Sequence, residues 1–161
     1  MAQFGANAQF DWERDASDDE RFAFVGRPRR TLLRPGWIGT RFTTARQNSP
    51  IGAWWVDLEV LGELIEHTER AGRIGIHSAA REGLAITHEW SRRLNQLHAY
   101  RFLQPCWAWV GPASPQAVSE SGLSHRLLMG GFEQTFIPGL SSVDVMRIGT
   151  AGPYLARAGH A

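Results

Sequence analysis

Polar residues stand at the ends of several predicted strands, where their side chains could do chemistry. Arg41 interrupts a strand that otherwise alternates apolar and polar residues, and Ser49 precedes a proline shortly before a pair of tryptophans. Residues 130–134, Gly-Gly-Phe-Glu-Gln, place two glycines, an acid and an amide at the start of another strand. Adjacent glycines permit positive φ and close approach of the backbone to a ligand. We therefore expect a ligand site at these strand ends. A plain β-turn with a hydrogen-bonding amide is the alternative for residues 130–134.

Two neighbouring pairs of residues in these segments must divide between opposite faces of their strands. Side chains alternate along a strand, so only one of Glu133 and Gln134 can point into a given cleft. The choice matters because a glutamate can accept a proton during catalysis, whereas a glutamine cannot act as a base. Trp54 and Trp55 divide in the same way, which leaves one of them to line a cleft and stack on a ligand. Arg81 is a further candidate for contact with a phosphate, and an exposed surface position is the alternative for it.

The apolar pattern predicts helices early in the chain and strands late. Ser17 and Glu20 form a capping box that opens a helix to about Phe24, and Asp57 begins a helix with one apolar face. The predicted strands cover residues 31–33, 39–43, 53–56, 84–87, 99–103, 107–110, 134–137 and 143–148, with a short helix over 89–97. This order favours one α+β domain over residues 1–161, with loose termini at 1–16 and 152–161.

The composition excludes several classes of protein and site. No apolar run is long enough to span a bilayer, and residues 1–5 lack the features of a secretory signal. A net charge of +1, from 17 basic and 16 acidic residues, argues against a nucleic-acid binder. The chain has no lysine, which excludes the phosphate-binding loop that requires one. Cys106 is the only cysteine and no His-Glu-x-x-His pattern occurs, so we expect no metal site and a buried, unreactive Cys106.

Five motifs occur in an order that resembles a known family. They are residues 39–42, Ser49-Pro50 with Trp54-Trp55, residues 87–91, residues 111–116 and residues 130–139. Their order and spacing, from about residue 34 to 148, resemble the NAD-using toxin domains at the ends of bacterial polymorphic effectors. Those domains belong to the broader ADP-ribosyltransferase superfamily. The resemblance implies an ADP-ribosyltransferase-like fold, with a split β-sheet core and a few helices.

The resemblance also implies a role for each candidate residue in an NAD site. Arg41 would grip the NAD phosphates, because a guanidinium can pair with two oxygens at once. Ser49 would support the nicotinamide ribose, although no Ser-Thr-Ser triplet accompanies it. Gln134 or Glu133 would orient the ribose and stabilise the oxocarbenium-like state that forms as the nicotinamide–ribose bond breaks. A glutamine there would favour hydrolysis or transfer to a reactive acceptor, and a glutamate would favour transfer to a poor nucleophile.

The function that the resemblance implies is that of an NAD-consuming toxin, either a mono-ADP-ribosyltransferase or an NAD glycohydrolase. NAD would be the substrate, and an acceptor protein and a cognate immunity protein would be candidate partners, with no membrane or nucleic acid involved. The chain would act in the cytoplasm, or be delivered into a target cell by a route other than Sec. Two alternatives stay open: a non-catalytic binding module on a related fold, and a structural or virion-type protein.

Overall fold

The computed structural model describes residues 7–43, 51–71, 80, 84, 96–120, 124–128 and 130–150. Its helices are α1 (Trp12–Asp15), α2 (Asp18–Phe22) and α3 (Leu58–Ala71). Its strands are β1 (Arg29–Leu33), β2 (Ile38–Thr43), β3 (Trp54–Asp57), β4 (Gln96–Phe102), β5 (Cys106–Pro112), β6 (Gln116–Glu120), β7 (Ser124–Leu128), β8 (Glu133–Phe136) and β9 (Val145–Thr150). Within these ranges, no helix is long and apolar enough to cross a membrane.

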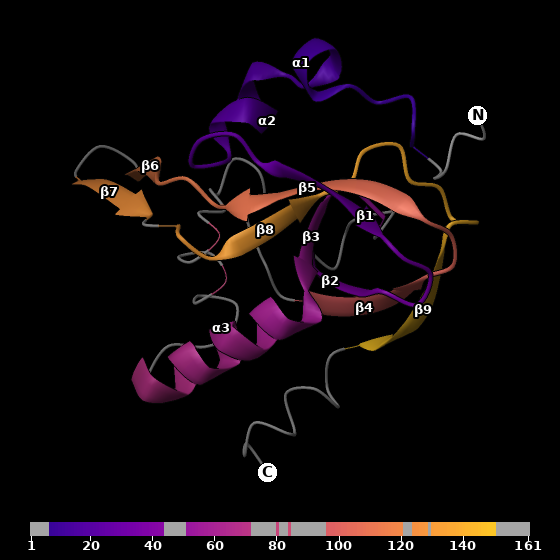
Figure 1. Cartoon of the computed structure of the whole chain (residues 1–161). Coiled ribbons are helices and arrows are strands. Elements are labelled where there is room, and N and C mark those ends of the chain that lie inside the picture. Colours follow the sequence, from indigo (N-terminus) through magenta and orange to yellow (C-terminus); the bar gives the residue numbers. More distant parts are fainter. Residues whose placement is uncertain are drawn as a thin grey trace.

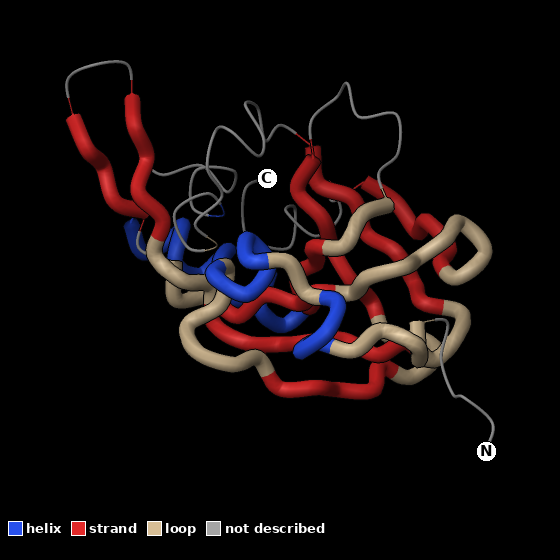
Figure 2. The backbone as a smooth tube through the Cα atoms, turned by 90° about the horizontal axis from the view of Figure 1, so that it is seen from above, coloured by secondary structure: helices blue, strands red, loops and turns tan. Residues whose placement is uncertain are grey.

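Seven of the strands form one sheet, in the order β1-β5-β8-β3-β2-β4-β9. Each neighbouring pair in this sheet is antiparallel. Strands β6 and β7 form a separate two-stranded hairpin, which extends away from the sheet in both views (Figures 1 and 2). An antiparallel sheet with a few helices confirms the α+β class that the sequence predicts.

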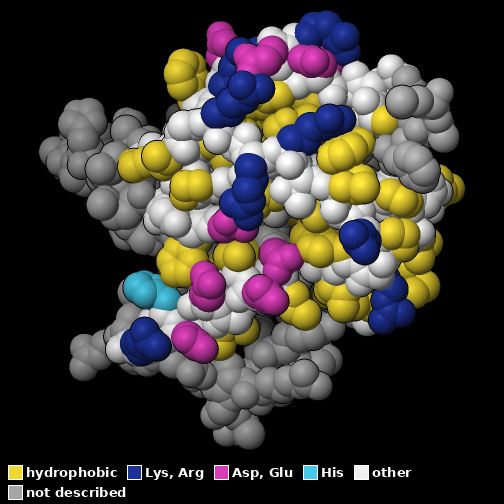
Figure 3. Space-filling model, viewed as in Figure 1, with side chains coloured by type: hydrophobic (Ala, Val, Ile, Leu, Met, Phe, Trp, Pro, Cys, Tyr) yellow, Lys and Arg dark blue, Asp and Glu magenta, His cyan; other side chains and the backbone are white. Residues whose placement is uncertain are grey.

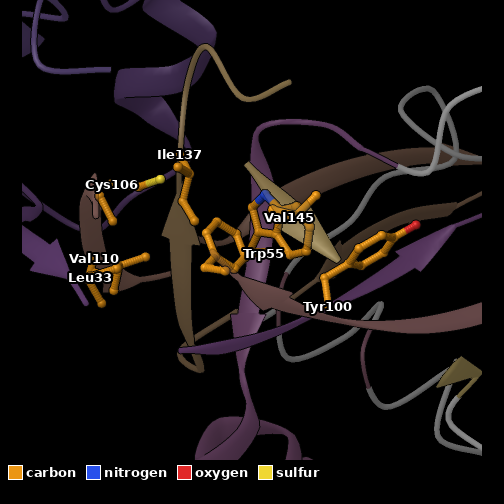
Figure 4. Close-up of a cluster of buried hydrophobic side chains, with 9 residues drawn as sticks. Leu33, Trp55, Tyr100, Cys106, Val110, Ile137 and Val145 are labelled. Carbon is orange, nitrogen blue, oxygen red and sulfur yellow. The ribbon is translucent and has the colours of Figure 1, made fainter. Parts of the chain in front are cut away.

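The two faces of the sheet carry different groups. Alternation along β3 sends Val56 into a hydrophobic cluster with α3, while Trp55 points to the opposite side. On β4, Leu97 joins the cluster with α3 and Tyr100 joins Trp55. We call the side opposite α3 the Trp55 face. Figure 4 shows the cluster of buried side chains around Trp55 on this face.

Helix α3 forms as its sequence predicts. Asp57 precedes its first residue, and the Asp57 Oδ1 accepts a hydrogen bond of 2.8 Å from the backbone N–H of Glu59. Its buried residues are Val60, Leu61 and Leu64, and its exposed acidic residues include Glu59, Glu63 and Glu66. Acidic side chains gather over α3 in the space-filling view (Figure 3). One face of α3 therefore holds the sheet and the other meets solvent.

The first residues that the structure describes are not a loose arm. Trp12 of α1 is buried and stacks on Trp109 of β5, with ring centroids 6.1 Å apart. The Asn7 side chain donates to the carbonyl oxygens of Trp107 and Pro138 and accepts from the Trp107 N–H. Figure 1 shows α1 and α2 above β5 and β1. The expectation of loose residues 1–16 is therefore wrong for residues 7–16, because their side chains find partners on distant strands. Residues 152–161 lie outside the described ranges.

The capping box and most of the predicted strands are confirmed. The Ser17 Oγ accepts from the Glu20 N–H at 3.2 Å, and the Glu20 carboxylate accepts from the Ser17 N–H at 2.8 Å. Each predicted strand from 31–33 to 53–56 and from 99–103 to 143–148 overlaps an observed one. Local patterns and caps thus predict these elements to within a few residues.

Two predicted elements between α3 and β4 do not fit. The predicted helix over 89–97 overlaps the start of β4, where Leu97 pairs with Phe42 of β2. The predicted strand 84–87 begins at Leu84, whose N–H instead donates to the Ala80 carbonyl oxygen, four residues earlier, as in a helical turn. The rest of these two segments, residues 85–87 and 89–95, lies outside the described ranges. Hairpin β6–β7 was not predicted, because residues 116–120 and 124–128 contain few β-branched or aromatic residues.

Candidate functional site

Arg41 lies within β2, on the Trp55 face. Its register partner is His98 of β4, and its chain neighbour Phe42 packs on the α3 side. The Arg41 Nε donates to the carbonyl oxygen of Trp54 at 3.0 Å. Its Cζ lies 5.4 Å from the centroid of the Trp55 ring, within the range of a cation–π contact. The neighbouring strand β3 therefore fixes the position of the guanidinium.

The Arg41 side chain is half-buried. Burial lowers the pKa of Arg41 to about 10, which leaves the guanidinium charged at neutral pH. A cation that has already lost much of its hydration loses less when an anion replaces the remaining water. Arg41 is therefore suited to hold an anionic group of a ligand.

Gly52 leaves the space that the Arg41 guanidinium occupies. A Cβ atom at residue 52 would lie 2.5 Å from an Arg41 terminal nitrogen and 2.8 Å from its Cζ. We predict that Gly52→Ala displaces the guanidinium, because the end of a flexible side chain moves more easily than backbone. Affinity for an anionic ligand such as NAD should fall by roughly tenfold or more, the effect of losing one charge-assisted hydrogen bond. Titration with NAD measures it.

The matched control is Gly62→Ala on helix α3. Nothing lies within 4 Å of a Cβ at residue 62, so this change should raise stability by roughly 0.5–1 kcal/mol and leave ligand affinity alone. Equal affinities for the two alanine variants would show that Gly52 does not position Arg41.

Three side chains that sequence reasoning missed lie beside Arg41 on the Trp55 face. His98 and Tyr100 are alternate residues of β4, and Arg147 of β9 is the register partner of Tyr100. The Arg147 terminal nitrogen Nη2 lies 3.0 Å from the His98 Nδ1. His98 and Tyr100 are both buried. We call Arg41, His98, Tyr100 and Arg147 the arginine cluster.

The two guanidiniums set the electrostatics of the arginine cluster. Burial and the charges of Arg147 and Arg41 lower the pKa of His98, so its neutral form is favoured. Burial raises the pKa of Tyr100, while the same two arginines act to lower it. Both groups are therefore neutral at pH 7, and the charges that act on them are positive. The cluster presents two cations and two neutral polar groups on one face of the sheet.

The tryptophan pair divides between the faces as expected. Trp55 is buried on the Trp55 face, edge-to-face with Tyr100 and Phe102. Trp54 lies on the other face, against Phe24 and Phe136. The tryptophan that shares a face with Arg41 is thus Trp55, and its burial makes it a support for Arg41 rather than an exposed stacking surface.

Strand β8 also separates Glu133 from Gln134. Thr135 is the register partner of Trp55, so Thr135 and Glu133 lie on the Trp55 face. Gln134 points to the opposite side, where it is 8% exposed and its Nε2 donates to the Ala23 carbonyl oxygen at 2.7 Å. Of the two candidates, Glu133 is the one that shares a face with Arg41.

Glu133 is held by a bidentate ion pair. Its two carboxylate oxygens accept from the Arg29 guanidinium at 3.0 and 2.9 Å. Glu133 lies on β8 and Arg41 on β2, with β3 between these two strands in the sheet.

The glycine pair before β8 has the predicted backbone conformation. Gly130 has φ of 65° and Gly131 has φ of 95°. A Cβ at residue 130 would clash with the Ala113 carbonyl oxygen, which accepts from the Gly131 N–H at 2.9 Å. The group that lies close to Gly130 is thus the backbone after β5 and not a ligand. This favours the interpretation of residues 130 and 131 as a plain turn.

Two sequence candidates, Ser49 and Arg81, lie outside the residues that the structure describes. Within the described ranges, no group of three or more His, Cys, Asp or Glu side chains could hold a metal ion. Cys106 is buried in the cluster around Trp55, as expected for a small apolar side chain. The described part of the candidate site therefore consists of the arginine cluster, Trp55 and Glu133.

Comparisons with known proteins give structural matches only. No protein-family model and no curated protein matches the sequence. Rhs1-CT, in complex with its cognate immunity protein RhsI1, aligns at 16% identity over 75% of this chain and 76% of its own, with a TM-score of 0.50. Tne2 in complex with Tni2 gives 14% identity, 76% and 88% coverage and a TM-score of 0.49. Tse6 in complex with Tsi6 gives 16% identity, 85% and 87% coverage and a TM-score of 0.48. The likeness to Rhs1-CT indicates a shared fold.

Proposed function

We propose that this chain is a bacterial effector toxin domain that consumes NAD by breaking the nicotinamide–ribose bond. The observation that carries the proposal is the Trp55 face, where a half-buried guanidinium on β2 and a carboxylate on β8 lie on the same face of one sheet. Arg41 is held beside Trp54 and Trp55, and Glu133 lies on the same face through the register of β8 with β3. The motif order in the sequence supports the same activity.

In this proposal Arg41 binds the diphosphate of NAD. A guanidinium matches two phosphate oxygens and keeps its charge at pH 7, even with its pKa lowered by burial to about 10. The nicotinamide ribose is attached directly to this diphosphate through its 5′ carbon.

Glu133 supplies the charge and the base. The nicotinamide–ribose bond breaks with its electron pair going to the ring nitrogen, so that nicotinamide leaves neutral and the ribose becomes oxocarbenium-like. The Glu133 carboxylate stabilises this cation, and it accepts the proton of the water or acceptor group that attacks the ribose C1′. Water gives ADP-ribose and an acceptor gives an ADP-ribosylated product.

The toxin role is supported by the fold. Rhs1-CT, which shares it, is bound to a cognate immunity protein. An NAD-consuming enzyme would harm the cell that makes it, so we propose that this chain also has a cognate immunity protein. We further propose that the chain reaches its target cell by a route other than Sec.

A second candidate function is NAD binding without turnover. Both oxygens of Glu133 are engaged by Arg29, and Gln134 is engaged by Ala23 on the other face. A carboxylate that stays bound to Arg29 would leave the site able to hold a nucleotide but unable to assist bond breaking. Binding of NAD with no release of nicotinamide would select this function.

The proposal predicts loss of activity in Arg41→Ala. Without the Arg41 guanidinium, the NAD phosphates lose charge-assisted hydrogen bonds. The rate of NAD consumption at subsaturating NAD should therefore fall by roughly 10- to 100-fold. The fluorescence of residual NAD in the presence of purified protein measures it, and free ADP-ribose distinguishes hydrolysis from transfer.

Arg30→Ala is the matched control for the loss of one positive charge. Arg30 is exposed on β1 and stacks over the Trp107 ring at 3.9 Å, away from the Trp55 face. Its replacement should leave NAD consumption unchanged. Absence of NAD consumption and of NAD binding by the unaltered chain would refute the proposed function.

A further inference from the structure

The Tyr100 hydroxyl is buried and has no hydrogen-bond partner. The residue is 3% exposed, and its hydroxyl oxygen is the one buried side-chain polar atom without a partner among the described residues. Figure 4 shows the hydroxyl pointing away from Trp55 and Val145. A buried hydroxyl without a partner is unfavourable and requires an explanation. A ligand that completes the hydrogen bond would provide one.

The surroundings of this hydroxyl are positively charged. Arg147 is the register partner of Tyr100, and Arg41 is the register partner of His98, two residues earlier on β4. The charges of both arginines act on Tyr100 and on His98. Arg41, Tyr100 and Arg147 therefore lie on one face of the sheet, on the neighbouring strands β2, β4 and β9.

The contact between Arg147 and His98 fixes the histidine as a neutral acceptor. A guanidinium has only donors, so the His98 Nδ1 that lies 3.0 Å from Arg147 must accept, and the ring proton is on Nε2. His98 thereby orients the Arg147 guanidinium beside Tyr100 and adds no second positive charge. Arg41 and Arg147 are both positively charged and lie on one face, so both would attract a dianion that binds between them.

We propose that Tyr100 and Arg147, positioned by His98, form an oxyanion site that acts with Arg41 to bind a diphosphate group. The Tyr100 hydroxyl donates to one oxygen, and the two guanidiniums bind the others. The inference deepens the proposed function, on which it rests for the identity of the ligand, because it assigns the diphosphate of NAD to β2, β4 and β9. The anion site itself can be tested without any turnover.

The test is calorimetric titration of the full chain with inorganic pyrophosphate. Tyr100→Phe should weaken binding by roughly tenfold, because one hydrogen bond to a charged group is lost. The melting temperature of the unliganded variant should not fall, since the hydroxyl it lacks made no hydrogen bond. Arg147→Gln should weaken binding by roughly tenfold or more and reduce the salt dependence of binding.

Arg101→Gln is the matched control. Arg101 is exposed on the same strand β4 and, next to Tyr100 in the chain, points to the opposite face. The Arg101→Gln variant should bind pyrophosphate with the affinity of the unaltered chain. Equal weakening in Arg101→Gln and Arg147→Gln, unchanged binding in Tyr100→Phe, or no pyrophosphate binding by the unaltered chain would each overturn the site.

Parallel NAD assays separate this inference from the proposed function. Pyrophosphate binding that depends on Tyr100 and Arg147, without NAD consumption, would leave the anion site standing and refute the enzyme. NAD consumption that is insensitive to Arg147→Gln, without pyrophosphate binding, would support the enzyme and refute the anion site.

Discussion

Glu133→Gln is expected to abolish most NAD consumption while the protein stays folded. The change removes the negative charge and the proton-accepting oxygen and keeps the shape of the side chain. Loss of a general base and of its charge at an oxocarbenium-like centre should lower turnover by about 10²- to 10⁴-fold. The measurement is the initial rate of NAD loss at saturating NAD. The melting temperature of the same sample shows whether the variant is folded. Stability should change little, because an exposed pair with Arg29 contributes little.

Gln134→Met should lower stability and leave turnover unchanged, the opposite of what Glu133→Gln should do. Gln134 lies on the face away from Arg41, and its replacement removes a buried hydrogen bond to Ala23. The Ala23 carbonyl oxygen still accepts from the Ser114 N–H at 2.8 Å, so the cost should be about 1 kcal/mol of unfolding free energy. Turnover by the folded fraction should persist. Loss of turnover in Gln134→Met with full activity in Glu133→Gln would reverse the assignment of the two residues.

Glu63→Gln controls for the chemistry of the substitution. Glu63 is exposed on α3, on the side of the sheet opposite the Trp55 face. The change removes one negative charge from the molecule, as Glu133→Gln does. Its rate should match that of the unaltered chain, so that a fall in Glu133→Gln reports position rather than net charge.

The elements that the sequence predicts well are those whose signals are local. Asp57 and the apolar spacing after it specify α3, and Ser17 with Glu20 specifies the start of α2, because capping bonds and helix faces lie within a few residues. Leu97 is different. It continues the apolar spacing of a helix from Trp90 and Leu94, yet it pairs with Phe42 in the sheet. Pairing with a strand more than fifty residues away overrides a short local period.

The candidate site could be predicted only in part for a similar reason. Arg41 is conspicuous as a charged residue within an apolar strand, and alternation predicts that Glu133 and Gln134 separate. His98, Tyr100 and Arg147 come from two strands, and no motif joins them. A local signal existed for His98 and Tyr100, since residues two apart on a strand share a face. Which face they share, and that Arg41 is on it, depends on the β2–β4 register.

Trp12→Ala is the second change with a large expected effect, on stability rather than activity. Trp12 is 7% exposed and contacts the rings of Phe24, Trp109 and Phe136. Replacing a buried aromatic side chain by alanine removes its burial and leaves a cavity, which costs about 3–5 kcal/mol. Urea unfolding measures the loss as a lower midpoint with an unchanged slope.

Phe22→Ala is the control for Trp12→Ala. It tests whether the loss of stability comes from the burial of Trp12 or follows the loss of any aromatic ring near the N-terminus. Phe22 ends α2, ten residues after Trp12, and is 73% exposed. Its replacement should change the unfolding free energy by no more than about 0.5 kcal/mol. Similar small effects for both variants would mean that burial of Trp12 contributes little to stability. A large effect confined to Trp12→Ala would establish that this segment completes the core behind β5 and β8, the two strands that carry Trp109 and Glu133. Truncation of the N-terminal segment would then unfold the site as well.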